Sequence, residues 1–453
     1  MSRPAQFKPI GAISEVMYMR DSDACSHTGY PYFVVKGKVE LEAMRLAVRK
    51  MQESFPDTVS RVEERKIGLQ HLLLRVPIED PPGLEVIDDY AHDLGGLSVF
   101  DALKKIFEPR YTRRMDVHRE VPMRITLVRL PEDRAAIVFF FHHIAADGAT
   151  MMAVNKRLFS AYHEAMTGQA PDWAAGEDMT SSAGKATQGY SFMKVIRQMM
   201  AEGRLKKSHP VIRLGHDVRV TNSKRHMVRI MMAEDETREL VRKSKTLGVT
   251  VNDLLSVSII RAVDACLGTP EGTFSFWLST NVRGIKNSSG DQSNYTAATP
   301  VDLIRSERLD EKQLLHAFVL RRKTQMEMGR AYYSLKMLDW VLRFARLFPV
   351  AWRRPFLRRM LSVPITFMSS NIGAIFPKRV GGRLTADTYL TGAGGLEILD
   401  WDTNFTAMEE PGHELAAWTY LGKFNATFTV FEEFMERADA EKLMLLVRQE
   451  LLR

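Results

Sequence analysis

Apolar residues in the first part of the 453-residue chain recur at two different spacings. β-Branched and aromatic residues predict a strand at 32–39, and apolar residues three and four positions apart predict a helix over 40–55 that ends at Pro56. The same two spacings predict a strand at 69–78 and a helix at 97–107. Strands and helices thus alternate from the start of the chain, as in an α/β protein.

Two apolar runs, 123–130 and 135–141, flank the turn sequence PEDR and predict a β-hairpin. The second run, AAIVFFF, is apolar at nearly every position, which is expected of a strand covered on both faces. The spacing then becomes helical and continues to Gly168, a residue that favours a helix end. His142 and His143 therefore lie between a buried strand and a helix, where catalytic groups often collect.

A similar set of elements follows a segment rich in Gly, Ala, Ser and Thr at 168–190, which is the best linker candidate. The expected elements are a basic helix at 191–207, a strand at 226–233, a helix at 250–268, a strand at 274–284 and a hairpin at 416–433. We therefore expect an N-terminal lobe at 1–170, a linker with a connecting helix at 171–220, and a C-terminal lobe at 221–453.

The composition is that of an ordinary globular protein, with 45% hydrophobic and 26% charged residues. The two cysteines, Cys25 and Cys266, have no disulfide or metal spacing and favour a reducing, cytoplasmic location. The first residues lack the apolar core of a secretory signal. The longest uncharged run, 360–377, contains prolines, serines and an asparagine, so we interpret it as buried strand and turn and expect no transmembrane helix.

The net charge of +8 favours anionic partners in general, and much of it is concentrated in 341–360, VLRFARLFPVAWRRPFLRRM. One interpretation of this segment is a pair of amphipathic helices with solvated arginines. The other is a patch that lies on an anionic membrane or a lipid droplet, because basic and bulky apolar groups together favour the interface. The arginines alternate with apolar helix positions rather than with exposed stacking aromatics, so no nucleic-acid partner is expected.

Several common catalytic motifs are absent from the sequence, namely G-x-S-x-G, the P-loop, H-E-x-x-H and C-x-x-C. A serine hydrolase, an NTPase and a zinc peptidase are therefore disfavoured, and no metal is expected. A histidine near a strand end is often only a hydrogen-bonded structural residue. Adjacent residues of an extended segment point opposite ways, so one of His142 and His143 can face a cavity while the other braces the connection. A neutral imidazole held in this way is suited to act as a general base.

The residues from His142 to Gly148, HHIAADG, match the pattern H-H-x-x-x-D-G. In this motif the chain resembles the acyltransferase superfamily related to chloramphenicol acetyltransferase. That superfamily includes peptide-synthetase condensation domains, polyketide-associated acyltransferases and bacterial wax ester synthase/diacylglycerol acyltransferases. Three further segments resemble later motifs of these enzymes: TVNDLLSVSIIRAV at 250–263, STNVRG at 279–284 and MSSNIGAIFP at 368–377.

The resemblance implies an α/β fold made of two chloramphenicol-acetyltransferase-like lobes, each an α+β two-layer unit, in a V with a central tunnel. It also implies that His143 is the general base that removes a proton from an alcohol or amine acceptor, while His142 braces the connection. The acceptor would attack the acyl thioester directly, without a covalent acyl-enzyme. No permanently bound cofactor is implied, and the acyl donor is acyl-CoA or a phosphopantetheine-linked acyl group.

The resemblance further implies supporting residues around the motif. Asp147 would be structural and ion-paired to an arginine, for which Arg283 is the candidate, although Arg283 is equally explained as a solvated turn residue. A flexible Gly148 is expected to let the connection fold back tightly.

Four residues of the second half are candidates for the opposite side of the cleft. Asn252 and Asp253 either cap their helix or organise the cleft facing the histidines. Asn281 and Asn371 are candidates for lining the cleft or stabilising an oxyanion.

Three functions remain open from the sequence. The first is an acyltransferase that moves an acyl group, expected to be fatty acyl, from a CoA or carrier-protein thioester to a hydroxyl acceptor. The second is a free-standing condensation enzyme that takes its acyl group from an acidic acyl carrier protein and forms an amide or ester in natural-product biosynthesis, for which a positive surface would suit docking. The third is a non-catalytic lipid-binding module.

Overall fold

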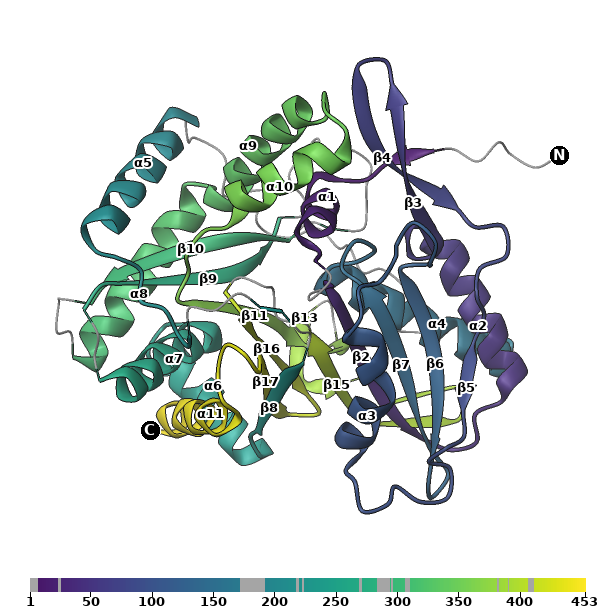
Figure 1. Ribbon diagram of the computed structural model, residues 1–453. Coiled ribbons are helices and arrows are strands. Elements are labelled where there is room, and N and C mark those ends of the chain that lie inside the picture. Colours follow the sequence, from purple (N-terminus) through teal and green to yellow (C-terminus); the bar gives the residue numbers. More distant parts are fainter. Residues whose placement is uncertain are drawn as a thin grey trace.

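The computed structural model describes most of the chain (Figure 1). The segments outside the described residues are 1–6, 23–25, 172–191, 217–219, 222–223, 269–270, 283–293, 295, 306–309, 381–382, 390 and 406–410. Arg283 and most of the expected linker at 168–190 fall in these segments, so the predictions about them lie outside the described residues.

The first half of the chain builds most of a six-stranded sheet with the order β14-β15-β2-β7-β6-β5. Its strands are β2 (Thr28–Lys36), β5 (Glu85–Ile87), β6 (Met123–Leu130), β7 (Arg134–His142), β14 (Gly392–Ala393) and β15 (Leu396–Phe405). Strands β6 and β7 pair in antiparallel register across the PEDR turn, which confirms the predicted hairpin.

Helices cover both faces of this sheet. The helices are α1 (Ala12–Arg20), α2 (Leu41–Ser54), α3 (Val99–Tyr111) and α4 (Gly148–Thr167). Phe139 and Phe141 of β7 belong to the core beneath α2 and α4. Phe140, between them, belongs to a second core with α1 and α3. Because alternate residues of β7 enter two different cores, the whole strand is apolar, as the sequence predicted.

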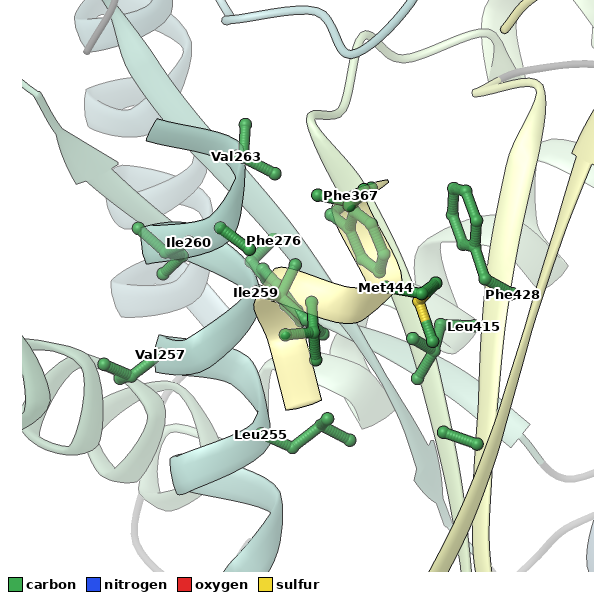
Figure 2. Close-up of a cluster of buried hydrophobic side chains, with 14 of the residues drawn as sticks. Leu255, Val257, Ile259, Ile260, Val263, Phe276, Phe367, Leu415, Phe428 and Met444 are labelled. Atoms are coloured by element: carbon green, nitrogen blue, oxygen red, sulfur yellow. The ribbon is translucent and has the colours of Figure 1, made fainter. Parts of the chain in front are cut away.

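The second half builds another six-stranded sheet, with the order β10-β9-β11-β16-β17-β8. Its strands are β8 (Arg225–Met231), β9 (Thr273–Asn281), β10 (Thr296–Ile304), β11 (Phe367–Ala374), β16 (His413–Tyr420) and β17 (Lys423–Phe431). One face is covered by helices α6 (Glu234–Thr246), α7 (Val251–Leu267), α8 (Glu311–Glu327) and α11 (Arg437–Leu452). Figure 2 shows this core, where Met444 of α11 lies beside Leu415 of β16 and Ile259 of α7 belongs to the same cluster.

The two sheets are interlocked rather than merely consecutive. Strand β15 leaves the second half and pairs antiparallel with β2 of the first sheet. In β16, Leu415 packs in the second core while Trp418 packs in the first. The division into lobes at 170 and 220 stays a prediction, but it does not foresee that residues 392–405 supply strands to the first sheet.

Smaller elements occupy one end of the molecule (Figure 1). They are β1 (Lys8–Pro9), β3 (Ser60–Ile67), β4 (Gln70–Pro77), α9 (Arg330–Ala345) and α10 (Val350–Leu361); the remaining elements are η1 (Pro56–Val59), α5 (Phe192–Ser208), β12 (Pro377–Val380) and β13 (Arg383–Tyr389). Within the described residues, no single helix is long and apolar enough to cross a membrane, and only α6 with α7 would pass as a pair bent by 100°.

Candidate active site

The histidine pair lies where the first half's central strand meets its following helix. Strand β7 ends at His142, and Asp147 is the residue that caps the N-terminus of α4. Residues 143–146 connect them. We call residues 142–147, which comprise this connection and its two flanking residues, the histidine loop. Buried elements thus fix both ends of this loop.

His142 is fully buried and held in one tautomer. Its Nδ1 accepts a hydrogen bond from the Ile144 backbone N–H at 3.0 Å, so the ring proton lies on Nε2. That Nε2–H donates to Asp21 Oδ2 at 2.7 Å. Both ring nitrogens are used within the fold, which supports the bracing role expected for His142.

Asp21 is the centre of a buried cluster with two histidines. Besides His142, it accepts hydrogen bonds from the His27 ring Nδ1 at 2.8 Å and from the His27 backbone N–H at 3.1 Å. Burial opposes ionisation of Asp21, but the interactions with His142 and His27 outweigh it and hold the pKa of the carboxyl well below its ordinary value. The pKa of His27 is lowered, because its burial outweighs the carboxylate. These shifts favour an ionised Asp21 and a neutral His27.

The carbonyl of Ile144 fixes the middle of the histidine loop. It accepts hydrogen bonds from Ser14 Oγ at 3.1 Å and from the Arg75 Nη2 at 2.7 Å. Arg75 is itself buried and lies 3.4 Å from the carboxylate of Asp57. The loop backbone is thus tied to α1 and to β4, two elements far away in the sequence.

The second half of the chain holds the other side of the loop. Asp147 Oδ1 caps α4 by accepting from the Thr150 backbone N–H at 2.9 Å, and Oδ2 accepts from Thr296 Oγ1 at 3.2 Å. Asn294 Nδ2 donates to the carbonyl of His143, whose own N–H donates to the His27 carbonyl at 2.6 Å. The structural role expected for Asp147 is consistent with these bonds.

His143 differs from His142 in what surrounds its ring. The ring packs against Phe141 and Phe405, with centroids 5.4 Å and 6.0 Å away. Its Nδ1 is buried, while the residue as a whole is partly exposed, so Nε2 is the open nitrogen. Burial lowers the pKa of His143 to about 4, the neighbouring histidines act in the same direction, and Asp147 opposes them. The ring is therefore neutral at ordinary pH.

Gly148 was expected to let the connection fold back tightly through its flexible backbone, and this reason for a glycine is wrong. Gly148 is the first residue of α4 and does not adopt a positive φ, so its backbone needs no glycine. A Cβ built there meets no other atom within 4 Å. What the glycine provides is open space beside the histidine loop.

Asp253 is occupied by structural contacts. It completes a capping box with Thr250 at the start of α7. Its two oxygens also accept from Arg322, with Nε–Oδ1 at 2.5 Å and Nη2–Oδ2 at 3.0 Å. Of the two roles left open by the sequence, the structure supports the cap. The cleft role of Asn252, whose Oδ1 is buried and accepts no hydrogen bond from the described residues, stays a prediction.

The remaining candidates lie on the second sheet. Asn281 ends β9 in register with Thr296, the residue that binds Asp147, so it lies near the junction with the histidine loop. Asn371 Oδ1 accepts from the Gly373 N–H at 2.9 Å, at a bulge in β11 where Gly373 has a φ of 83°. Their roles in the cleft stay predictions.

Sequence reasoning missed most of the loop's partners. Asp21, His27, Arg75, Asn294 and Thr296 come from segments up to 151 residues away, and no local pattern marks them. Within the residues that the structure describes, no group of three or more His, Cys, Asp or Glu side chains is arranged to hold a metal ion.

Comparison with known families identifies this architecture. The sequence model of the condensation domain matches residues 31–261, which include the histidine loop. The chain belongs to the condensation-domain family. Members of this family are acyl-transferring enzymes that form amide or ester bonds. The resemblance stated from the motif is thereby confirmed.

Among curated proteins, the chain is similar to the isonitrile lipopeptide synthase of Mycobacterium tuberculosis, with 36% identity over 74 residues. This match covers 16% of the chain and 3% of that synthase. A probable non-canonical nonribosomal peptide synthetase of Salinispora arenicola is 29% identical over 94 residues, which cover 20% of the chain and 1% of that protein. The chain therefore spans only a small part of the length of these relatives.

Among solved structures, the first condensation domain of the CDA synthetase superposes with a TM-score of 0.68 at 13% identity, covering 99% of this chain and 96% of that one. Polyketide synthase associated protein 5 of Mycobacterium tuberculosis gives a TM-score of 0.64 at 14% identity, covering 99% and 98%. At such identities the likeness shows the fold alone. It confirms the expected fold of two chloramphenicol-acetyltransferase-like lobes.

Proposed function

We propose that this condensation domain transfers an acyl group from a phosphopantetheine thioester on a carrier protein to an amine or hydroxyl acceptor, with His143 as the general base. The observation that carries the proposal is the contrast between the two histidines. His142 spends both ring nitrogens on the fold, whereas His143 is neutral and keeps Nε2 open. Residues from both halves of the chain hold the loop backbone, so the base is positioned before a substrate arrives.

The proton and the leaving group balance without a covalent acyl-enzyme. The acceptor nitrogen or oxygen attacks the thioester carbonyl, and its proton passes to Nε2 of His143. The tetrahedral intermediate then expels the phosphopantetheine thiolate, which takes the proton back from the imidazolium. General-base help of this kind contributes roughly 10²–10⁴-fold, and the positioning of two substrates supplies the rest.

A carrier-bound donor is favoured over free acyl-CoA. The hypothesis of a fatty acyl-CoA transferase of the wax ester synthase type gains no specific support from the comparisons. The similar curated proteins are named as a lipopeptide synthase and a nonribosomal peptide synthetase, whose names point to acyl groups joined in peptide assembly. The second hypothesis, a condensation enzyme, is therefore our choice.

The environment of His143 favours an amine acceptor over an alcohol. A base with a pKa of about 4 has little driving force to deprotonate a hydroxyl during attack. An amine attacks without such help and becomes strongly acidic once its bond to the carbonyl forms, so a weak base suffices. Amide formation is thus the expected main reaction.

The test compares donors and acceptors with the purified chain. The same acyl groups are offered on CoA and on a phosphopantetheinylated carrier protein, with an amine or a matched alcohol as acceptor, and the released thiol and the product are measured. We expect carrier-dependent amide formation, abolished in His143→Ala and retained in His92→Ala, a control at an exposed histidine.

Three outcomes would contradict the proposal. Undiminished turnover in His143→Ala would exclude His143 as the general base. If free acyl-CoA were used as well as the carrier-bound donor, and alcohols as well as amines, the first hypothesis, an acyl-CoA-dependent transferase to a hydroxyl, would be restored. Lipid binding without consumption of any thioester would favour the non-catalytic module.

A further inference from the structure

Helices α9 and α10 present an unusual outer surface. Their bulky apolar side chains face solvent rather than the core, and Trp340, Phe344, Trp352 and Phe356 are 69%, 68%, 73% and 61% exposed. Further exposed residues on the same helices and their flanking turns are Leu347, Phe348, Met360 and Val363. On each helix these residues recur three, four, seven or eight positions apart, so they form one outward stripe.

Three arginines of the same segment point inward. Arg346 and Arg353 form ion pairs with Glu15 of α1 at 2.7 Å and 2.9 Å, and Glu15 is almost fully buried. Arg354 donates to the carbonyl of Asp21 at 2.5 Å and lies over the ring of Tyr18, 5.2 Å from its centroid. The inner face of this helix pair therefore carries three partnered arginines, which neither interpretation of 341–360 made from the sequence foresaw, while Arg343 and Arg359 stay exposed.

The tip of the β3–β4 hairpin extends this apolar surface. Leu69 is 79% exposed, and Ile67 beside it is also exposed. The hairpin is fixed to the helices by the His71 N–H, which donates to the Arg346 carbonyl at 2.6 Å, and by Arg353, which donates to the His71 carbonyl at 2.8 Å. Figure 1 shows the hairpin and both helices at the same end of the molecule. We call this surface, formed by the outward residues of α9 and α10 and by the hairpin tip, the aromatic end.

The charge around the aromatic end is positive. Between Lys336 and Met360 the chain has seven Lys and Arg residues and one Asp, and Arg346 and Arg353 are paired with Glu15 on the inner side. Lys336, Arg343 and Arg359 are exposed on the same two helices. Exposed aromatic groups ringed by cations are complementary to the boundary between anionic headgroups and acyl chains.

We propose that the aromatic end docks on an anionic lipid membrane, lying in its interface without crossing it. A contiguous exposed apolar patch of this kind marks an interaction surface. The patch is a pair of convex helices beside a protruding hairpin tip, a shape that a fluid lipid surface accommodates without a matching hollow. Trp is also the side chain most favoured at the headgroup level. This inference is independent of the acyl-transfer chemistry.

The test uses the purified chain and vesicles of phosphatidylcholine with or without phosphatidylglycerol, read out by flotation and by the emission of tryptophan. We expect binding to the anionic vesicles, a blue shift from Trp340 and Trp352, and weaker binding in high salt. Trp352→Ser and Phe356→Ser should each lower partitioning by about tenfold or more, since each removes one buried aromatic group. Leu445→Ser, at an exposed apolar residue of α11, is the matched control and should bind like the parent. Circular dichroism of each variant checks the fold.

Several results would contradict docking of the aromatic end on a membrane. Absence of vesicle binding by the parent chain, or equal binding by the Trp352 and Phe356 variants, would overturn the proposal. It would also be overturned if the two substitutions abolished self-association in light scattering, or binding to a purified acyl carrier protein, while leaving vesicle binding unchanged. In those cases the aromatic end would be a protein interface.

Discussion

Replacing Asp21 by Asn tests whether the buried cluster holds the histidine loop in place. The substitution keeps the size of the side chain but exchanges one acceptor oxygen for an NH₂ donor. Oδ1 of Asp21 accepts from both the ring and the backbone of His27, and Oδ2 accepts from His142. An asparagine can keep the oxygen on only one of these two sides.

Neither orientation of the asparagine satisfies the cluster. With its NH₂ toward His142, two donors face each other unless that ring changes tautomer, and the change would lose the bond from the Ile144 N–H. With its NH₂ toward His27, it meets a backbone N–H that has no other state. One buried donor stays unsatisfied, at a cost of about 2–3 kcal/mol.

That cost should appear locally, because the cluster braces the loop that carries His143. Hydrogen exchange at the amides of residues 142–147 should accelerate about 30- to 150-fold, the equilibrium factor for the same free energy. Turnover should fall on the order of 10²-fold through misplacement of the base. Asp88→Asn, at an exposed carboxylate 3.4 Å from Arg129, is the matched control and should change neither quantity. Unchanged exchange and turnover in the Asp21 variant would refute the bracing argument.

Three further predictions concern His143, Gly148 and Asp253. Because the pKa of His143 is lowered to about 4, kcat/KM should stay level down to about pH 5 and fall as the pH drops through about 4, measured with an acceptor that does not titrate there. The folded-state pKa lies below the ordinary 6.5, so protonation disfavours folding, and Tm should decrease as the pH falls from 6.5 towards 4; a Tm that rises instead would contradict the assignment. Gly148→Ala should stabilise α4 by about 0.5–1 kcal/mol yet lower turnover, since its methyl enters the open space beside the loop, whereas full activity would show that no substrate uses that space. Asp253→Asn should lower the free energy of unfolding by about 3–5 kcal/mol, because it leaves the partly buried Arg322 without its carboxylate, with turnover retained while the chain is folded; lost turnover at an unchanged Tm would restore the cleft role.

The local frame of the site could be predicted from the sequence because its signals are local. The apolar run at 135–141 predicted β7, and the helical spacing after it predicted α4. Gly168 ends that helix, as predicted, in the left-handed conformation at a φ of 72°. The opposed orientations of His142 and His143 follow from the extended backbone at the strand end. Each of these inferences needs only residues within a few positions of the motif.

The partners of the loop could not be predicted in the same way. Arg75 reaches Ile144 from β4, a strand of the separate three-stranded sheet, and Thr296 reaches Asp147 from β10, a strand of the second six-stranded sheet. Such contacts depend on topology, which spacing does not encode. In 341–360, the alternation of arginines with bulky apolar residues could not tell which of these side chains face inward. The buried carboxylate of Glu15, more than 300 residues earlier in the chain, decides it.

Helix α1 is the element on which both the histidine loop and the aromatic end depend. Ser14 binds the loop carbonyl of Ile144, and Asp21, at the C-terminal end of the helix, fixes the tautomer of His142. Between them, Glu15 anchors the arginines that hold α9 and α10 in place. The polar groups of one short helix therefore face the base on one side and the cationic inner face of the helix pair on the other. A buried Glu15 is favourable only while both arginines stay paired with it, so the same charge that turns the aromatic side chains outward also fixes α1 against the loop.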